Sequence, residues 1–77
     1  MELRQLQYFD AIARTGGFRT AADELSVSPA TLSEQIKYLE QELGVRLFVR
    51  TSRNVALTEA GRALLGRAER ALAELRT

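Results

Sequence analysis

Apolar side chains recur along this chain at spacings that predict four helices, with a short non-helical segment before the last one. The first helical pattern runs from Leu3 to Arg14 and is followed by Thr15-Gly16-Gly17, so we expect the helix to stop there. Gly16 is suited to the left-handed backbone of a helix C-cap. The predicted apolar face of this helix consists of Leu3, Leu6, Phe9, Ala13 and, as a further candidate, Ile12.

Two further helical patterns, at residues 18–25 and 29–43, are separated by only three residues. Ser28 is suited to cap the second of them, and Pro29 to occupy its first position, where a missing N–H costs nothing. Ala21 and Ala22 in the first of these helices are small, so the second helix can cross it at a short distance. Two helices joined by such a tight turn predict a helix-turn-helix, whose second helix is the kind that enters a DNA major groove. The predicted apolar faces are Phe18, Ala21, Ala22 and Leu25 in the first helix, and Leu32, Ile36, Leu39 and Leu43 in the second.

Residues 46–57 have a different pattern, in which two short apolar or β-branched runs flank a polar stretch with two arginines. This pattern predicts a β-hairpin, and a hairpin beside a helix-turn-helix is a wing. Thr58 is suited to cap a last helix, which continues without a stop signal. We therefore predict a mainly α fold: a winged helix-turn-helix of three helices and a two-stranded β wing over residues 1–57, followed by a long linker helix over 58–77.

The charge is unevenly distributed, although the net charge of the 77 residues is only +1. Residues 1–43 carry a net charge of −3, residues 44–57 carry +3 with no acidic side chain, and residues 58–77 carry +1. The positive charge is thus concentrated directly after the second helix of the pair. Such a cluster favours contact with nucleic acid more than the net charge does.

Several function classes are disfavoured by what the sequence lacks. Without cysteine or histidine, and with no nucleophile–base set or glycine-rich phosphate loop, the chain is not expected to be an enzyme. We expect no catalytic residue, no cofactor and no metal site. There is no apolar run of membrane-spanning length and no signal-peptide character at the N-terminus. We therefore expect a soluble, cytoplasmic protein with no membrane partner.

Four blocks of the sequence occur in an order that is typical of one family: Phe18 to Ser28, Leu32 to Glu40, Leu43 to Arg50, and Leu57 to Gly61. Through them the chain resembles the N-terminal DNA-binding domain of LysR-type transcriptional regulators. The resemblance implies dimers through the linker helix, tetramers in the intact regulator, and a C-terminal effector-binding domain beyond the present sequence. We expect an isolated DNA-binding domain. Two positions depart from the family pattern. The family commonly has Ser-Gln-Pro before this helix, whereas this chain has Ser28-Pro29-Ala30, and Glu34 stands where an arginine is frequent.

The candidate DNA contacts fall into base-reading and phosphate-binding groups. Glu34 is either an acceptor for cytosine N4 or a solvated surface acid. Arg53, at the predicted wing tip, either enters a flanking minor groove or serves solubility. Arg46 either contacts DNA or forms an ion pair with Glu40 or Glu42. The base-contact candidates are Ser28, Pro29, Ala30, Thr31, Ser33 and Glu34. The phosphate and minor-groove candidates are Arg4, Gln5, Lys37, Arg50 and Arg53.

The apolar stripe of the last helix predicts a homodimer, because a helix of about 18 residues spans about 27 Å and exceeds what a small three-helix body covers. The alternative is that the stripe packs only on its own domain. A dimer would bind double-stranded DNA at interrupted inverted repeats. A different function, a protein-interaction module, remains compatible with the low net charge and with Glu34. The predicted dimer interface is Leu64, Leu65, Ala68, Ala71, Leu72 and Leu75.

Overall fold

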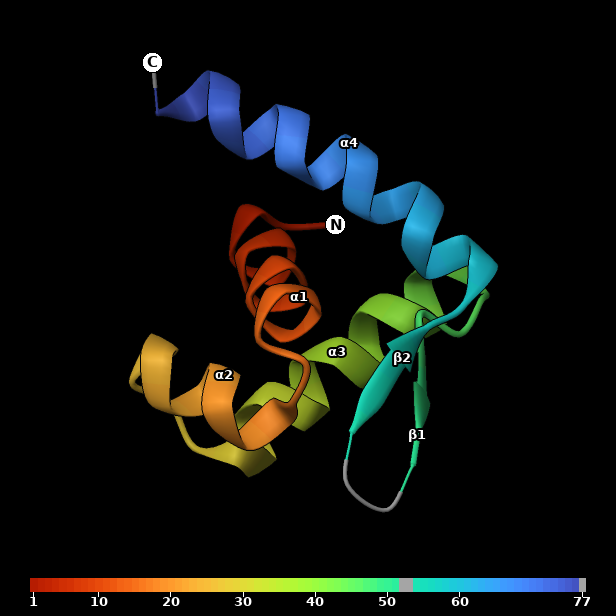
Figure 1. Cartoon of the computed structure of the whole chain (residues 1–77). Helices are drawn as coiled ribbons and strands as arrows, with labels where there is room; N and C mark the ends of the chain where they lie inside the picture. The colour runs from red at the N-terminus through yellow and green to blue at the C-terminus, as the bar shows by residue number, and fades with distance from the viewer. Residues whose placement is uncertain (52–53, 77) are drawn as a thin grey trace.

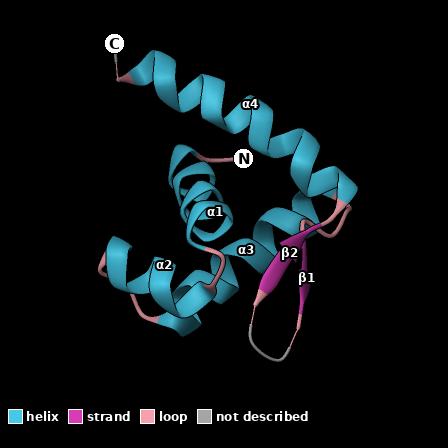
Figure 2. Cartoon of the chain, viewed as in Figure 1, coloured by secondary structure: helices cyan, strands magenta, loops and turns pink. Residues whose placement is uncertain are grey.

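A computed structural model describes residues 1–51 and 54–76 of the chain. The elements follow one another as α1 (Leu3–Thr15), α2 (Phe18–Leu25), α3 (Pro29–Leu43), β1 (Phe48–Arg50), β2 (Val55–Leu57) and α4 (Glu59–Leu75). Figures 1 and 2 show α1 at the centre, with α4 crossing one side of it and the α2–α3 pair and the hairpin on the other. Within the described residues, no helix is long and apolar enough to cross a membrane.

The helix boundaries follow from capping chemistry, and the predicted boundaries of α1, α2 and α3 are confirmed to within one residue. Gly16 and Gly44 end α1 and α3 with φ values of +82° and +72°, a conformation that glycine adopts without steric cost. Ser26 adopts a φ of +59° in the turn between α2 and α3. Ser28 caps α3, since its Oγ accepts a hydrogen bond from the Thr31 amide at 3.0 Å.

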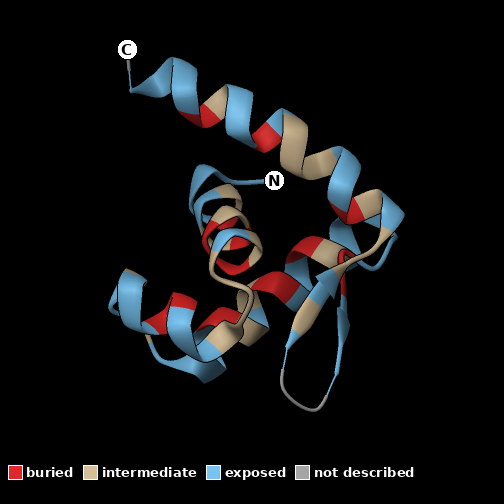
Figure 3. Ribbon diagram, in the orientation of Figure 1, coloured by how far each residue is buried: buried red, intermediate tan, exposed pale blue. Residues whose placement is uncertain are grey.

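The hydrophobic core lies where α1, α2, α3, the hairpin and α4 meet, shown in red in Figure 3. Its largest fully buried side chains are Phe9, Ile12, Leu32, Ile36, Leu39 and Leu47. Two predicted core positions are wrong, because Leu3 is 47% exposed and Leu43 is 38% exposed. Leu3 is the first residue of α1 and Leu43 the last of α3, so both lie at helix ends, beyond the tightly packed centre.

The hairpin is a two-stranded antiparallel sheet in which Phe48 pairs with Leu57 and Arg50 with Val55. Its strands are shorter than the predicted wing of residues 46–57, because residues 46 and 47 precede β1. Thr51 and Asn54 close the hairpin through backbone and side-chain hydrogen bonds of 2.8 to 3.0 Å. The Val55 amide also donates to the Gly16 carbonyl at 3.3 Å, which joins the hairpin to the end of α1.

Helix α4 shares the core with the rest of the chain, so the predicted division between residues 57 and 58 separates two parts of one packed unit. Ala68 and Leu72 are 1% and 4% exposed, and α4 packs against α1. These two residues were predicted to face a second copy of the chain, and that prediction is wrong for them because α1 covers them. Leu64 and Leu65 are partly buried against the same core, whereas Leu75 is 65% exposed.

Candidate nucleic-acid interface

The start of α3 is open to solvent up to Thr31, whereas Leu32 in the same turn is buried. Ser28, Pro29, Ala30 and Thr31 are all exposed, and the Ser28 hydroxyl donates to Thr31 Oγ1 at 2.9 Å. Figure 1 shows this end of the α2–α3 pair on the side of the molecule away from α4, and the hairpin extends toward the same side. The two surfaces predicted to contact DNA therefore face the same way.

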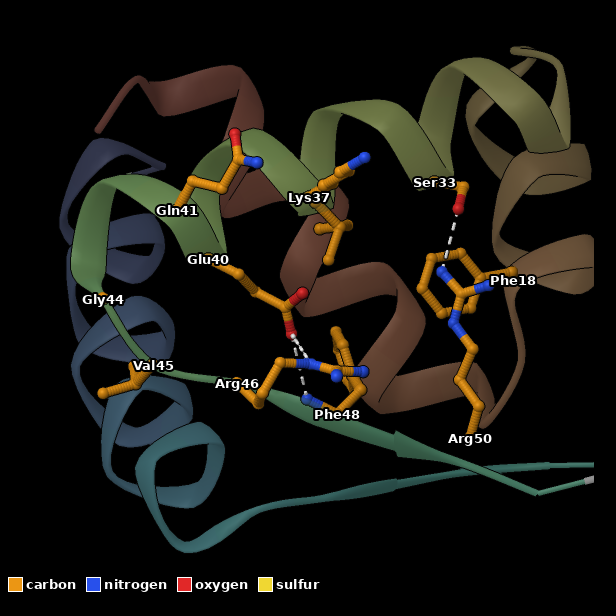
Figure 4. Close-up of a pocket in the computed structure, with 11 residues that line it drawn as sticks. Phe18, Ser33, Lys37, Glu40, Gln41, Gly44, Val45, Arg46, Phe48 and Arg50 are labelled. Atoms are coloured by element: carbon orange, nitrogen blue, oxygen red, sulfur yellow. Dashed lines mark hydrogen bonds and ion pairs between the residues drawn. The ribbon is translucent and has the colours of Figure 1, made fainter.

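An open groove of about 550 Å³ lies between α3 and β1. Figure 4 shows Ser33, Lys37 and Gln41 along the α3 wall, with Arg46 and Arg50 on the opposite wall. Three cationic side chains thus border the groove, and Glu40 is the one acid among its lining residues. A groove of this charge suits a polyanion better than a small neutral molecule.

Glu40 holds the chain that leads into β1. Its Oε2 accepts hydrogen bonds from the Leu47 amide at 2.7 Å and the Phe48 amide at 3.4 Å, and lies 3.6 Å from Arg46 Nε. Arg46 therefore pairs with Glu40, one of its two predicted partners, while Glu42 binds the Met1 amino group. The Glu40 side chain is only 15% exposed.

Arg50 connects the wing to α3. Its guanidinium carbon lies 4.0 Å from the centre of the Phe18 ring, and its Nη2 donates to Ser33 Oγ at 2.8 Å. Figure 4 shows the guanidinium over the Phe18 ring, with its hydrogen bond to Ser33 as a dashed line. Arg50, the last residue of β1, and the half-buried Ser33 of α3 are thereby held together at the groove.

The remaining candidates differ in how accessible they are to DNA. Lys37 and Glu34 are exposed on α3, as a DNA contact requires. Gln5 is wrong as a phosphate contact, because it is 6% exposed and its Oε1 accepts from the Glu2 amide at 3.0 Å. Arg4 is exposed in the same turn, at the end of α1 that the Met1–Glu42 pair places beside the end of α3. Arg53 lies outside the described residues.

Sequence reasoning assigned no special role to two residues of the groove, Phe18 and Glu40. Phe18 was expected to be only a core residue, and it lies 32 positions before the arginine that it contacts. No local spacing could join those two positions. For Glu40 a signal existed, since an acid near the end of a helix, shortly before Gly44 and Arg46, is well placed to accept from the backbone that follows.

The chain spans only part of the length of the curated relatives compared with it, from 20% to 52%. It is 49% identical over 76 residues to the dual regulator OxyR of Escherichia coli, covering 99% of this chain and 25% of OxyR. It is 49% identical over 73 residues to the transcriptional regulator TfdT of Cupriavidus pinatubonensis, covering 95% of this chain and 32% of TfdT.

Solved structures share the whole fold. The CbnR_DBD–DNA complex superposes with a TM-score of 0.93 at 44% identity, covering 97% of this chain and 86% of that one. The BenM_DBD/catB site 1 DNA complex gives a TM-score of 0.95 at 41% identity, covering 99% and 85%. The model of the bacterial regulatory helix-turn-helix proteins of the lysR family matches residues 3–62. Together with the winged helix-turn-helix described above, these matches show that the chain belongs to the lysR family of bacterial regulatory helix-turn-helix proteins.

Proposed function

We propose that this chain binds double-stranded DNA in a sequence-specific manner, as the DNA-binding part of a LysR-type transcriptional regulator. The first turns of α3 enter the major groove, and the wing contacts the adjacent backbone or minor groove. The observation that carries the proposal is the Arg50–Ser33 hydrogen bond of 2.8 Å. Because it joins wing and α3 at one open groove, a single duplex can contact both.

Base recognition is assigned to residues at the start of α3, of which all but the half-buried Ser33 are exposed. The methyl group of Thr31 and the carbons of Pro29 and Ala30 suit a thymine methyl, while the hydroxyls of Ser28 and Ser33 suit base-edge donors or acceptors. Glu34 is exposed and, in this proposal, accepts from cytosine N4. Its charge also disfavours any approach that would place a phosphate in front of it.

Phosphate binding is assigned to Lys37 and Arg50, with Arg4 and Arg53 as further contributors in the proposal. Arg46 contributes less, because its charge is already compensated by Glu40 at 3.6 Å. Two phosphate contacts in each protomer correspond to a slope of about −2 when the logarithm of the binding constant is plotted against the logarithm of salt concentration.

A second copy of the chain is proposed to pack along α4. The residues available for this are the exposed Leu75 and the partly buried Leu64, Leu65 and Ala71, and the resulting dimer would recognise an interrupted inverted repeat. Leu75→Asp should abolish dimers in sedimentation at micromolar concentration while leaving the fold intact. A dimer unchanged in this variant would place the interface elsewhere. In the intact regulator we propose tetramers, a cytoplasmic location and no enzymatic activity.

The test is a duplex titration at two salt concentrations, with DNA recovered by selection from a random pool. Tight binding that weakens about tenfold or more between 50 and 200 mM salt is expected for several phosphate contacts. The absence of duplex binding at either concentration would overturn the proposal and favour a protein-interaction module. The matched control is Arg46→Gln, whose charge Glu40 already compensates, and it should change the slope less than Arg50→Gln.

A further inference from the structure

We propose that Phe18 is a positioning residue for DNA binding, because its ring holds the Arg50 guanidinium in the place from which it contacts a phosphate. This inference rests on the proposed function, since it needs Arg50 to face DNA. It adds a role for the first residue of α2, which reaches the duplex only through the arginine on the wing.

The guanidinium of Arg50 is restrained in two directions at once. The Phe18 ring, 4.0 Å from Cζ, supports it from one side, and Ser33 Oγ accepts from Nη2 at 2.8 Å. A guanidinium has five N–H donors, so this single hydrogen bond leaves four for a phosphate. An exposed arginine without such restraints would sample many rotamers and lose that freedom on binding.

The Phe18 ring is itself fixed by the core. It meets Phe48 edge-on, with centroids 5.9 Å apart and an interplanar angle of 72°, and Phe48 packs on Phe9 with centroids 5.2 Å apart. Phe9 and Phe48 are both buried. A continuous aromatic cluster, formed by Phe9, Phe48 and Phe18, therefore runs from α1 through β1 to the surface, where it ends under the guanidinium of Arg50. Such a support is rigid, which is what pre-organisation of a binding group requires.

Two readouts separate positioning from charge. Phe18→Leu keeps every charge, so the same number of phosphates is neutralised and the salt slope should stay the same while affinity falls about fivefold. Arg50→Gln removes a phosphate contact and should lower the magnitude of the slope by about one. Lower affinity at a constant slope shows that Phe18 is not itself a charge contact, and the double-mutant cycle then separates positioning of Arg50 from a purely structural effect.

The experiment is a double-mutant cycle in fluorescence anisotropy, with wild type, Phe18→Leu, Arg50→Gln and the double variant on one selected duplex. Phe18→Leu should weaken binding about fivefold in the wild-type background and have no further effect beside Arg50→Gln. Phe18→Tyr keeps the ring and should bind like the wild type. An equal loss in both backgrounds would show a merely structural role and overturn the proposal, and so would an unchanged affinity.

Arg50→Lys provides a test that leaves the core intact if Phe18→Leu does not fold. An ammonium group keeps the charge but has no planar face to lie on the ring, so affinity should fall about fivefold at constant salt slope, and wild-type affinity would overturn the proposal. A DNA-free readout is the ring-current shift of the Arg50 side-chain protons, which should be present in the wild type and lost in Phe18→Leu. If that shift is present but no duplex binds, the proposed function fails. If the wild type binds but the shift is absent, only the role of Phe18 fails.

Discussion

The starts of α3 and α4 have the same capping chemistry but opposite surroundings. Each begins after a hydroxyl residue, Ser28 or Thr58, whose oxygen accepts from an amide three residues later at 3.0 Å. The start of α3 is exposed, whereas the start of α4 is packed against the segment that precedes the hairpin. The comparison shows that capping determines where a helix begins, while the neighbouring elements determine whether that end can bind a ligand.

The contacts at the start of α4 are closely spaced. Thr58 Oγ1 donates to the Arg46 carbonyl at 2.6 Å, and the Thr58 amide donates to the Leu47 carbonyl at 3.0 Å. Gly61 is buried beside that same carbonyl, and a Cβ at Gly61 would lie only 2.2 Å from the Leu47 oxygen. The start of α4 therefore serves to hold the base of the wing, and that of α3 is left for recognition.

The largest expected effect is that of Gly61→Ala. The added methyl group meets a backbone oxygen that is held by hydrogen bonding, so we expect a loss of about 3 kcal/mol in the free energy of unfolding, measured by urea denaturation. Gly66→Ala is the matched control in the same helix, because its Cβ would lie 3.8 Å from a flexible Arg70 nitrogen. It should stabilise by about 0.5–1 kcal/mol. Similar effects of the two substitutions would contradict the close packing at Gly61.

The next effect compares the two caps directly. Thr58→Ala removes the cap and the hydrogen bond that ties α4 to the Arg46 carbonyl, so we expect a loss of about 2 kcal/mol. For Ser28→Ala we expect about 1 kcal/mol, because it removes the cap and only an exposed hydrogen bond to Thr31 within the same turn. The measurement is chemical denaturation of both variants under one set of conditions. A larger loss for Ser28→Ala would mean that the start of α3 supports the fold more than the start of α4 does.

The smallest effect lies outside both helix starts, at the Arg14–Glu24 pair between α1 and α2. The hydrogen bond from Arg14 lowers the pKa of Glu24 below its ordinary value. A lowered pKa stabilises the fold above the unfolded-state pKa, and that stability is lost as pH falls through the folded-state pKa. Because the pair is exposed, Glu24→Gln should cost little at neutral pH and nothing in acid, as thermal unfolding across pH would show. A cost that grows on acidification would contradict this assignment.

Local features of the chain were predictable, since they depend on neighbours in sequence. Gly16 ends α1 and Ser28 caps the start of α3, as expected, because backbone conformation and capping involve only a few successive residues. The apolar periodicity of α3 likewise predicted its buried residues apart from the terminal Leu43. The start of β1 was less predictable, because the side chain of Glu40, on a different element, binds the amides just before and at the start of this strand.

Tertiary placement accounts for what sequence reasoning missed. The stripe of α4 has the same periodicity whether it faces α1 or a second copy of the chain, so the burial of Ala68 and Leu72 could not be inferred from spacing. Gln5 was placed among the DNA contacts for its position at the start of α1, yet its amide oxygen is used by the Glu2 backbone. The contact between Phe18 and Arg50 depends on how α2 and the hairpin meet, which no pattern within either segment reports.

The most direct test of the account is an amide chemical-shift titration of this chain with a single selected half-site, which avoids shifts caused by pairing of two copies. The central claim is that the open start of α3 and the wing contact DNA while α4 does not. It predicts that the largest shifts occur in residues 28–37, 49–51 and 54–55, and that residues 65–76 stay unchanged. Shifts concentrated along α4, with residues 28–37 unaffected, would contradict it.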